Sequence, residues 1–342
     1  MTTIISGSSP SITFSDSTTQ STTAPSTSTF GFKNRIINGG MVIDQRNAGA
    51  AIASPSDNYT TDRFYSRQVG GGVASVQQSS TAPAGFTNSL LYTVTTPDSS
   101  IVTTDRYYVA QFIEGYTIAD FGWGTASAAT VTLSFWVRSS LTGTFGGALN
   151  NGGTRSYPFT YTINAANTFE QKTITIAGDT SGTWLTTNGV GLQVFFSLGS
   201  GPTYSGTAGS WSTNNYITAT GATNVIATNG ATFYITGVQL EVGTQATSFD
   251  FRDYGRELIL CQRYYQASSY GTTTYPSATG YARAYASFPV IMRTAPTMVF
   301  VDQGSGGSSL ASGSYANGYY NTYQSLASSS AGTFTWTATS EL

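Results

Sequence analysis

The chain has 342 residues, of which only 9% are charged, with 14 Lys and Arg against 16 Asp and Glu and no His. Ordinary soluble domains carry roughly a quarter charged residues. The net charge of -2 and the presence of only two lysines, Lys33 and Lys172, argue against a nucleic-acid partner, because phosphates attract clustered Lys and Arg. The single cysteine, Cys261, excludes an intramolecular disulfide. No run approaches the ~18 apolar residues of a membrane span, so we expect a soluble chain without membrane insertion.

The polarity of the chain comes from Ser, Thr, Asn, Gln and Gly. Ser, Thr and Asn side chains compete with the hydrogen bonds of a helix, and Gly adds backbone entropy. Thr, Tyr, Phe and Val favour strands. The composition therefore predicts an all-β fold.

Residues 1 to 33 are dominated by Ser and Thr, with a short apolar alternation at Ile12 and Phe14. Such a segment buries too little apolar surface by itself to offset the entropy lost on ordering. We interpret it as an extended N-terminal arm that is ordered by packing on another subunit.

Strand patterns follow from about residue 34 onward. At 131 to 138, apolar residues alternate with other residues from Val131 to Val137, which is typical of a strand with one face in a core. Similar patterns predict strands at 107 to 113, 157 to 163, 172 to 176, 190 to 198 and 232 to 240.

Two further signals concern the connections between strands. The apolar phase changes across Gly237, which predicts a β-bulge at that residue. Short strands joined by tight turns indicate a sandwich. Asn-Gly pairs suit such turns because both residues tolerate positive φ, and they begin at Asn38, Asn151, Asn188, Asn229 and Asn317.

A helical period occurs convincingly once, where Leu258, Cys261 and Tyr265 lie at positions i, i+3 and i+7. It predicts a short helical connector at 253 to 266. Strand patterns return after it, so we expect a smaller C-terminal β region at 267 to 342. Cys261 is expected to be a small buried hydrophobic residue.

Several segments resemble recurring pieces of tail-fibre and appendage proteins of tailed bacteriophages. The arm contains SITFSDSTTQSTTA (11 to 24), and NRIINGGMVIDQRNAG (34 to 49) resembles the opening of a carbohydrate-binding-module-like jelly roll. The most specific segment is GRELILCQRYY (255 to 265). It is followed by FPVIMRTAPTMVF (288 to 300) and WTATSEL (336 to 342), which resemble the C-terminal extension of these fibre proteins.

The resemblance implies a jelly-roll β-sandwich at 34 to 252, with an N-terminal extended arm, one short helix and the smaller C-terminal β region. It implies a homotrimer in an external appendage of the virion, attached to other virion proteins through residues 1 to 33. The first expectation is a tail fibre or receptor-binding protein that contacts host-surface glycan. The alternative is a head fibre, capsid decoration or baseplate subunit without receptor binding.

A third alternative is a polysaccharide depolymerase, because some phage tailspikes cleave host polysaccharide with paired carboxylates. Among the glutamates, Glu114 is the candidate for a cleft, near Asp105 and Asp120. A Ser or Cys nucleophile needs a histidine-like base, and the chain has none. We therefore expect no catalytic residue and no enzyme activity. We also expect no metal and no cofactor, since no dense acidic spacing occurs.

Aromatic residues are the candidates for ligand binding. Trp123, Trp184 and Trp211 lie among Gly, Ser and Thr, which suggests loops or sheet rims. One interpretation is that one or more of these rings stack on a sugar, and the alternative is that they pack in the core or at its rim. Tyrosines among Gly, Ser and Asn resemble recognition loops, with packing between subunits as the alternative. In the C-terminal region these candidates are Tyr315, Tyr319, Tyr320 and Tyr323.

Two Asp-Arg pairs are open to both interpretations. Asp62 with Arg63, and Asp105 with Arg106, fit either sugar contacts or internal salt bridges and hydrogen bonds. The resemblance favours the structural role.

Overall fold

The computed structural model describes residues 4–6, 11–13, 19–20, 33–53, 57–273, 281–302, 308–324 and 332–342. Side chains are described for 33–53, 57–268, 287–301, 312–319 and 335–342. The chain divides into two compact units, residues 1–33 and 34–342.

The first unit contains a small antiparallel sheet in the segment predicted to be an extended arm. Its three strands are β1 (Ile4–Ser6), β2 (Ser11–Thr13) and β3 (Thr19–Gln20), in that order. Ile12 lies in β2, whereas Phe14 lies outside the described residues.

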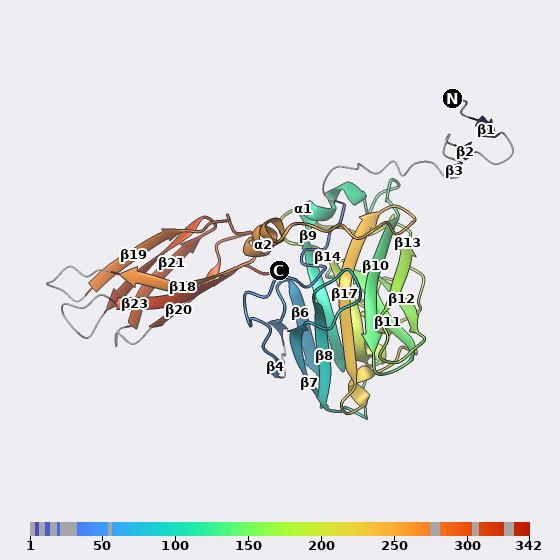
Figure 1. Ribbon diagram of the computed structural model, residues 1–342, viewed down its shortest axis with the longest axis horizontal. Coiled ribbons are helices and arrows are strands. Elements are labelled where there is room, and N and C mark those ends of the chain that lie inside the picture. The colour runs from blue at the N-terminus through green and yellow to red at the C-terminus, as the bar shows by residue number, and fades with distance from the viewer. Residues whose placement is uncertain are drawn as a thin grey trace. The chain divides into compact units, whose positions relative to one another are not determined.

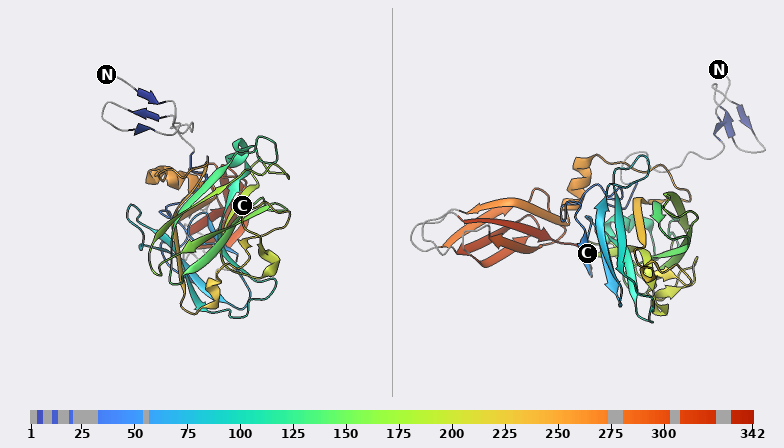
Figure 2. Two further views of the ribbon diagram at one scale, coloured as in Figure 1. Left: turned by 90° about the vertical axis from the view of Figure 1, so that its right-hand side faces the viewer. Right: turned by 60° about the horizontal axis from the view of Figure 1, so that its bottom comes forward.

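The second unit begins with a large sandwich of two six-stranded antiparallel sheets (Figures 1 and 2). The sheet that we call the β10 sheet has the order β13-β10-β17-β8-β7-β4. Its strands are β4 (Ile52–Ala53), β7 (Val73–Ser79), β8 (Ser89–Thr96), β10 (Val131–Ser139), β13 (Glu170–Ile176) and β17 (Thr232–Val242).

The opposing sheet, the β9 sheet, has the order β12-β11-β14-β9-β6-β5. Its strands are β5 (Asn58–Tyr59), β6 (Phe64–Val69), β9 (Arg106–Glu114), β11 (Gly143–Asn150), β12 (Ser156–Ile163) and β14 (Val190–Ser200). The predicted all-β class and the predicted jelly-roll sandwich are thereby confirmed.

The core lies between these two sheets and is rich in aromatic rings. In β10 the alternating residues from Val131 to Val137 are buried, as the sequence pattern predicts. The ring of Phe135 lies 5.0 Å, centre to centre, from Tyr161 and also from Phe196 on the opposing sheet. Edge-to-face contacts of this kind stabilise the core beyond the area that they bury.

The predicted bulge at Gly237 is confirmed. The register of β10 with β17 shifts between Ser134 and Trp136, and Gly237 has φ +60°. Ile235 and Val238 are both buried, so the extra residue preserves the core face of the strand across the change of phase.

Short elements connect the long strands. Of the five Asn-Gly pairs, those beginning at Asn38, Asn151 and Asn229 have one residue with positive φ. The segment after β14 folds back over the outer side of β11, β12 and β14. The connecting elements are α1 (Gly115–Ile118), η1 (Ala119–Phe121), η2 (Pro202–Tyr204), β15 (Ser205–Gly206), β16 (Thr218–Ala219) and η3 (Val225–Ala227).

The predicted helix is α2 (Tyr254–Gln262), and it is shorter than the expected connector. The Asp253 side chain accepts a hydrogen bond from the Arg256 backbone N–H at 2.9 Å, which caps the helix N-terminus. Cys261 is buried, and burial raises the pKa of its thiol. Tyr265 belongs to the following strand, so it does not continue the helix.

After α2, the chain forms two three-stranded sheets, drawn in orange and red in Figure 1. Their orders are β18-β23-β20 and β19-β22-β21, and Phe288, Met292 and Tyr319 pack in their small core. None of the described helices is long and apolar enough to cross a membrane. The strands are β18 (Tyr265–Thr273), β19 (Tyr281–Ser287), β20 (Thr297–Asp302), β21 (Ser308–Tyr315), β22 (Gly318–Gln324) and β23 (Gly332–Thr339).

Candidate functional site

Strand β9 carries apolar side chains on both of its faces. Successive side chains of a strand point to opposite sides. Tyr107 and Val109 belong to the main core, whereas Tyr108 belongs to a separate cluster on the outer side of the sheet. Arg106 and Phe112 share the phase of Tyr108, so they also lie on the outer side.

We call the outer cluster the aromatic face and define it by Tyr65, Tyr108, Phe112, Phe195 and Tyr204. Its rings contact one another across three strands. The ring centres of Tyr65 and Phe112 are 5.2 Å apart, and those of Tyr108 and Phe195 are 4.9 Å apart. Tyr65 and Phe195 both pair in register with Ala110, whose small side chain leaves room for them. The face is therefore continuous from β6 across β9 to β14.

The aromatic face is only partly shielded from solvent. Tyr65, Phe112 and Tyr204 are half-buried, whereas Phe195 and Tyr108 are buried beneath them. Rings that are held in place by their neighbours lose little entropy when they contact a ligand.

Polar groups border the exposed rings. Tyr65 donates its phenol proton to Asp57, and burial together with this bond raises the pKa of the phenol, so Tyr65 stays protonated. Arg67 Nη1 lies 3.2 Å from Oδ1 of Asp57. The half-buried Gln193 lies opposite Phe112 in the pairing of β14 with β9. This combination of apolar rings with donors and acceptors fits a ligand that has flat apolar faces and hydroxyl edges.

The three tryptophans that the sequence suggested for binding lie together, but mostly away from solvent. Trp123 and Trp184 are only 6% and 7% exposed, and their ring centres are 4.6 Å apart. Trp211 is partly buried and lies 5.2 Å from Trp123. The indole N–H of Trp123 donates to the Ala129 carbonyl at 2.8 Å. The packing alternative accounts for Trp123 and Trp184, because buried rings offer no face to a sugar.

The four candidate tyrosines of the C-terminal region are divided by the structure. Tyr315 is 62% exposed, as a recognition residue would be. Tyr319 is 6% exposed and its ring packs against Trp336 at 5.2 Å, so it serves the small core. Tyr320 and Tyr323 lie in β22, but their side chains are outside the described residues.

The carboxylates considered for catalysis are engaged in structural contacts. Glu114 is 4% exposed and accepts hydrogen bonds from Arg263 at 3.0 and 3.2 Å. Asp120 pairs with Arg35 at 2.6 Å. Within the described residues, no group of three or more His, Cys, Asp or Glu side chains is arranged to hold a metal.

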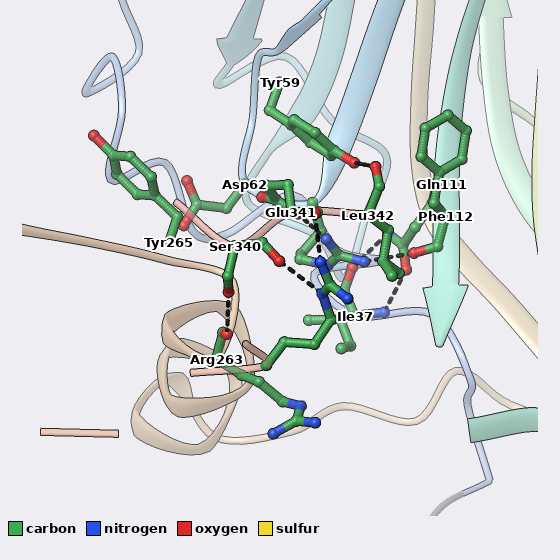
Figure 3. A network of polar contacts seen from close by, with 12 residues as sticks. Ile37, Tyr59, Asp62, Gln111, Phe112, Arg263, Tyr265, Ser340, Glu341 and Leu342 are labelled. Carbon is green, nitrogen blue, oxygen red and sulfur yellow. Dashed lines mark hydrogen bonds and ion pairs between the residues drawn. The ribbon is translucent and has the colours of Figure 1, made fainter. Parts of the chain in front are cut away.

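Asp62 and Arg63 lie in a buried network that also contains residues 340 to 342 (Figure 3). Arg63 donates to Glu341, and Tyr59 donates its phenol proton to the Leu342 carbonyl at 2.9 Å. Arg293 donates to the Ser340 and Glu341 carbonyls at 2.7 and 2.8 Å. We call the contacts of Glu341 and Leu342 with Tyr59, Arg63 and Arg293 the C-terminal anchor. We call the two three-stranded sheets after α2 the small sandwich, and the C-terminal anchor fastens its end to the large sandwich.

The C-terminal anchor assigns a structural role to the first Asp-Arg pair. Arg63 has φ +70°, and its guanidinium carbon lies 3.5 Å from the centre of the Tyr264 ring. Asp62 accepts from the Gln45 backbone N–H at 3.1 Å, and burial raises its pKa to about 6. Arg63 also donates to the Phe112 carbonyl, so the anchor supports one end of the aromatic face.

Exposed apolar residues gather at a second place, near α2. Phe251, Tyr254 and Ile259 are 64%, 62% and 53% exposed, and we call them the α2 strip. Beside them, a pocket of about 200 Å³ is lined by the rings of Phe86, Phe249 and Phe251. Exposed apolar groups of this size commonly mark a contact with another protein surface.

The aromatic face was not predicted. The alternation at 107 to 113 predicted a strand there, but not which side chains lie on which side of its sheet. The signal was present, because Tyr107 and Tyr108 put aromatic rings on both phases of one strand. A strand of this kind has apolar groups on both sides of its sheet.

No family model matches the chain, and no curated protein matches its sequence. Among solved structures, the chain is similar to the enzymatically active domain of tailspike protein 4 of bacteriophage CBA120, with 14% identity and a TM-score of 0.33. That match covers 61% of this chain and 21% of the tailspike chain.

The chain is also similar to a family 11 carbohydrate-binding module from Clostridium thermocellum, solved with a mixed-linked tetrasaccharide. The identity is 11%, the TM-score is 0.29, and the match covers 56% of this chain and 95% of the module. Because both TM-scores are below 0.5, the fold assignment rests on the strand order and register described above.

Proposed function

We propose that the chain is a structural protein of a bacteriophage virion, a subunit of a trimeric tail fibre or receptor-binding appendage that contacts host-surface glycan. The aromatic face is the observation that carries the glycan contact. The virion assignment is supported by segments between residues 11 and 342 that resemble pieces of phage appendage proteins and follow the same order along the chain.

Sugars present an apolar C–H face and hydroxyl groups around the ring. The half-buried rings of Tyr65 and Phe112 provide surfaces for the first, and Gln193 provides an amide for the second. The face lies on strands, and the C-terminal anchor supports it at Phe112. A binding site on strands is held more precisely than one on loops.

The proposed activity is binding without cleavage. The glutamate considered for acid-base chemistry, Glu114, is buried and paired with Arg263. A glycosidase needs two carboxyl groups that face one glycosidic bond. The carboxylate described at the border of the proposed contact surface is Asp57, whose side chain is 53% exposed and paired with Arg67.

The proposed assembly is a homotrimer that joins other virion proteins through residues 1–33. The α2 strip supports a contact between subunits, since Tyr254 and Ile259 are apolar residues on the solvent side of a helix whose Glu257 is buried. This distribution is the reverse of the usual pattern for a surface helix.

Adsorption to bacterial cells tests the proposed function. The labelled full chain is mixed with a panel of strains, each with and without its surface polysaccharide. We expect saturable binding that disappears with the polysaccharide, and about tenfold weaker binding for Tyr65→Ala and Phe112→Ala, because each loses an aromatic contact surface. Tyr116→Ala is the control, since Tyr116 is 62% exposed on α1.

Equal losses in the control and the two face variants would contradict the assigned site. Binding to no strain of the panel would favour the alternative of a head fibre, capsid decoration or baseplate subunit without receptor binding. Electron microscopy of virions with labelled antibody distinguishes a tail position from a capsid position.

A further inference from the structure

Two arginines emerge on the aromatic face beside its central ring. In the pairing of β6 with β9, Arg67 lies opposite Tyr108, and Arg106 lies opposite Val69. Arg67 and Arg106 are therefore diagonal neighbours on adjacent strands, a relation that puts residues about 7–8 Å apart on one side of a sheet.

The nearby carboxylates do not balance these two cations. Arg67 is paired with Asp57, whose side chain is 53% exposed. Asp105 is next to Arg106 in the chain, but it is buried and accepts a hydrogen bond from the Val102 backbone N–H at 2.8 Å. Among the side chains that the structure describes, no carboxylate forms an ion pair with Arg106.

Arg106 differs in this respect from the arginines that hold the fold together. Arg63, Arg155 and Arg252 each pair with a carboxylate. Arg106 instead donates from Nη1 to the phenol oxygen of Tyr204, and its guanidinium carbon lies 4.6 Å from the centre of that ring. A guanidinium has five N–H donors, so this phenol uses only part of its capacity.

We propose that the aromatic face binds anionic glycans and that Arg67 and Arg106 hold a carboxylate or phosphate group of the sugar. The inference rests on the glycan-binding function proposed above and names its substrate class. Paired N–H donors of a guanidinium match two oxygens of a carboxylate or phosphate. In a chain with only 9% charged residues, two adjacent cations beside one exposed carboxylate favour an anion at this face.

A printed array of neutral, uronate-bearing and phosphate-bearing bacterial polysaccharides tests the substrate class on the full chain. We expect the strongest binding to anionic members. Uronate and phosphate signals distinguish the two sources of the anion. We also expect binding to anionic members to fall by about tenfold or more between roughly 0.05 and 0.5 M salt, because salt screens exposed charges.

Substitutions test the assigned residues. Arg106→Ala is expected to weaken binding to an anionic glycan by about tenfold or more, in line with the loss of hydrogen bonds to a charged group. Arg106→Lys keeps the positive charge but not the paired N–H donors. We therefore expect its affinity for the anionic glycan to lie between those of the wild type and Arg106→Ala. The matched control is Arg138→Ala, because Arg138 also lies over a ring, 4.9 Å from the centre of Tyr234, but on the β10 sheet.

The outcomes separate this inference from the proposed function. The substrate class would be overturned if the wild type showed no preference for anionic members and if the wild type and Arg106→Ala bound neutral glycans equally. That result would leave glycan binding intact. Equal losses for Arg106→Ala and Arg138→Ala would overturn the site. Binding to no member of the array would overturn both the substrate class and glycan binding.

Discussion

Arg63 and Glu341 form an ion pair although 278 positions separate them in the sequence. The side chains of Arg63 and Glu341 are 1% and 7% exposed. Arg63 precedes β6 of the large sandwich, whereas Glu341 follows β23 of the small one. The pair therefore makes the two sandwiches depend on each other for their charge balance.

Glu341→Gln is expected to destabilise the protein by about 3–5 kcal/mol, because it leaves the buried Arg63 cation without its carboxylate. The free energy of unfolding in denaturant measures the loss. Asp57→Asn is the control, since Arg67 and Asp57 are 29% and 53% exposed, and exposed pairs contribute less than about 1 kcal/mol. Similar losses for the two variants would contradict a special role for the C-terminal anchor.

Asp62 gives the stability a dependence on pH. Burial raises its pKa from the ordinary 3.8 to about 6. Between about pH 4 and pH 6, the folded state therefore keeps a proton on Asp62 that the unfolded state has released. The favourable contribution is complete below about pH 4 and is lost as the pH rises through about 6. A change of about 2 in pKa corresponds to about 3 kcal/mol.

Asp62→Asn removes this titration. We expect its melting temperature to fall less than that of the wild type between pH 4 and 6, and thermal scans at several pH values measure the difference. Because other groups titrate in both proteins, the comparison isolates Asp62. Parallel curves for the two proteins would contradict the raised pKa of Asp62.

The sequence predicted the parts of the fold that depend on local alternation. The strand at 131 to 138 and the bulge at Gly237 were predicted correctly because their apolar residues face a single core. The strand β11 (Gly143–Asn150) was not predicted, since its Gly146 and Gly147 give no apolar period. Its position depends on pairing with β12 and β14, which single-sequence patterns do not describe.

The candidate site was harder to predict for a similar reason. Tyr65 and Phe112 are 47 positions apart and belong to different strands, and only the register of β6 with β9 brings them together. The tryptophans lie among Gly, Ser and Thr, which suggests loops or sheet rims, but their burial depends on contacts with residues far away in the sequence. Local composition could not distinguish an exposed ring at the rim of a sheet from a ring that is buried in the core.

The N-terminus of α2 depends on one side chain. Asp253 accepts a hydrogen bond from the Arg256 backbone N–H, so Asp253→Ala is expected to cost about 1 kcal/mol. Asp253→Asn retains an oxygen at the same place and should lose only a fraction of that. Denaturant unfolding of both variants measures the difference. An equal loss in both would indicate that the charge of Asp253, and not its hydrogen bond, stabilises the helix.

Two glycines with left-handed backbones allow a paired test of the bulge. Gly237 has φ +60°, and Gly230 has φ +71°. A Cβ at Gly237 would lie 2.7 Å from Phe86 Cζ and 3.0 Å from Trp136 Cδ1, whereas a Cβ at Gly230 would meet nothing within 4 Å.

Both alanine variants carry the backbone cost of about 1–2 kcal/mol for a left-handed residue. Gly237→Ala carries in addition the cost of moving two aromatic rings, about 1–3 kcal/mol for an overpacked site. We therefore expect Gly237→Ala to lose at least about 1 kcal/mol more than Gly230→Ala in denaturant unfolding. Equal losses would mean that Phe86 and Trp136 move aside at no cost in stability. The close approach of these rings would then not be a reason for glycine at position 237.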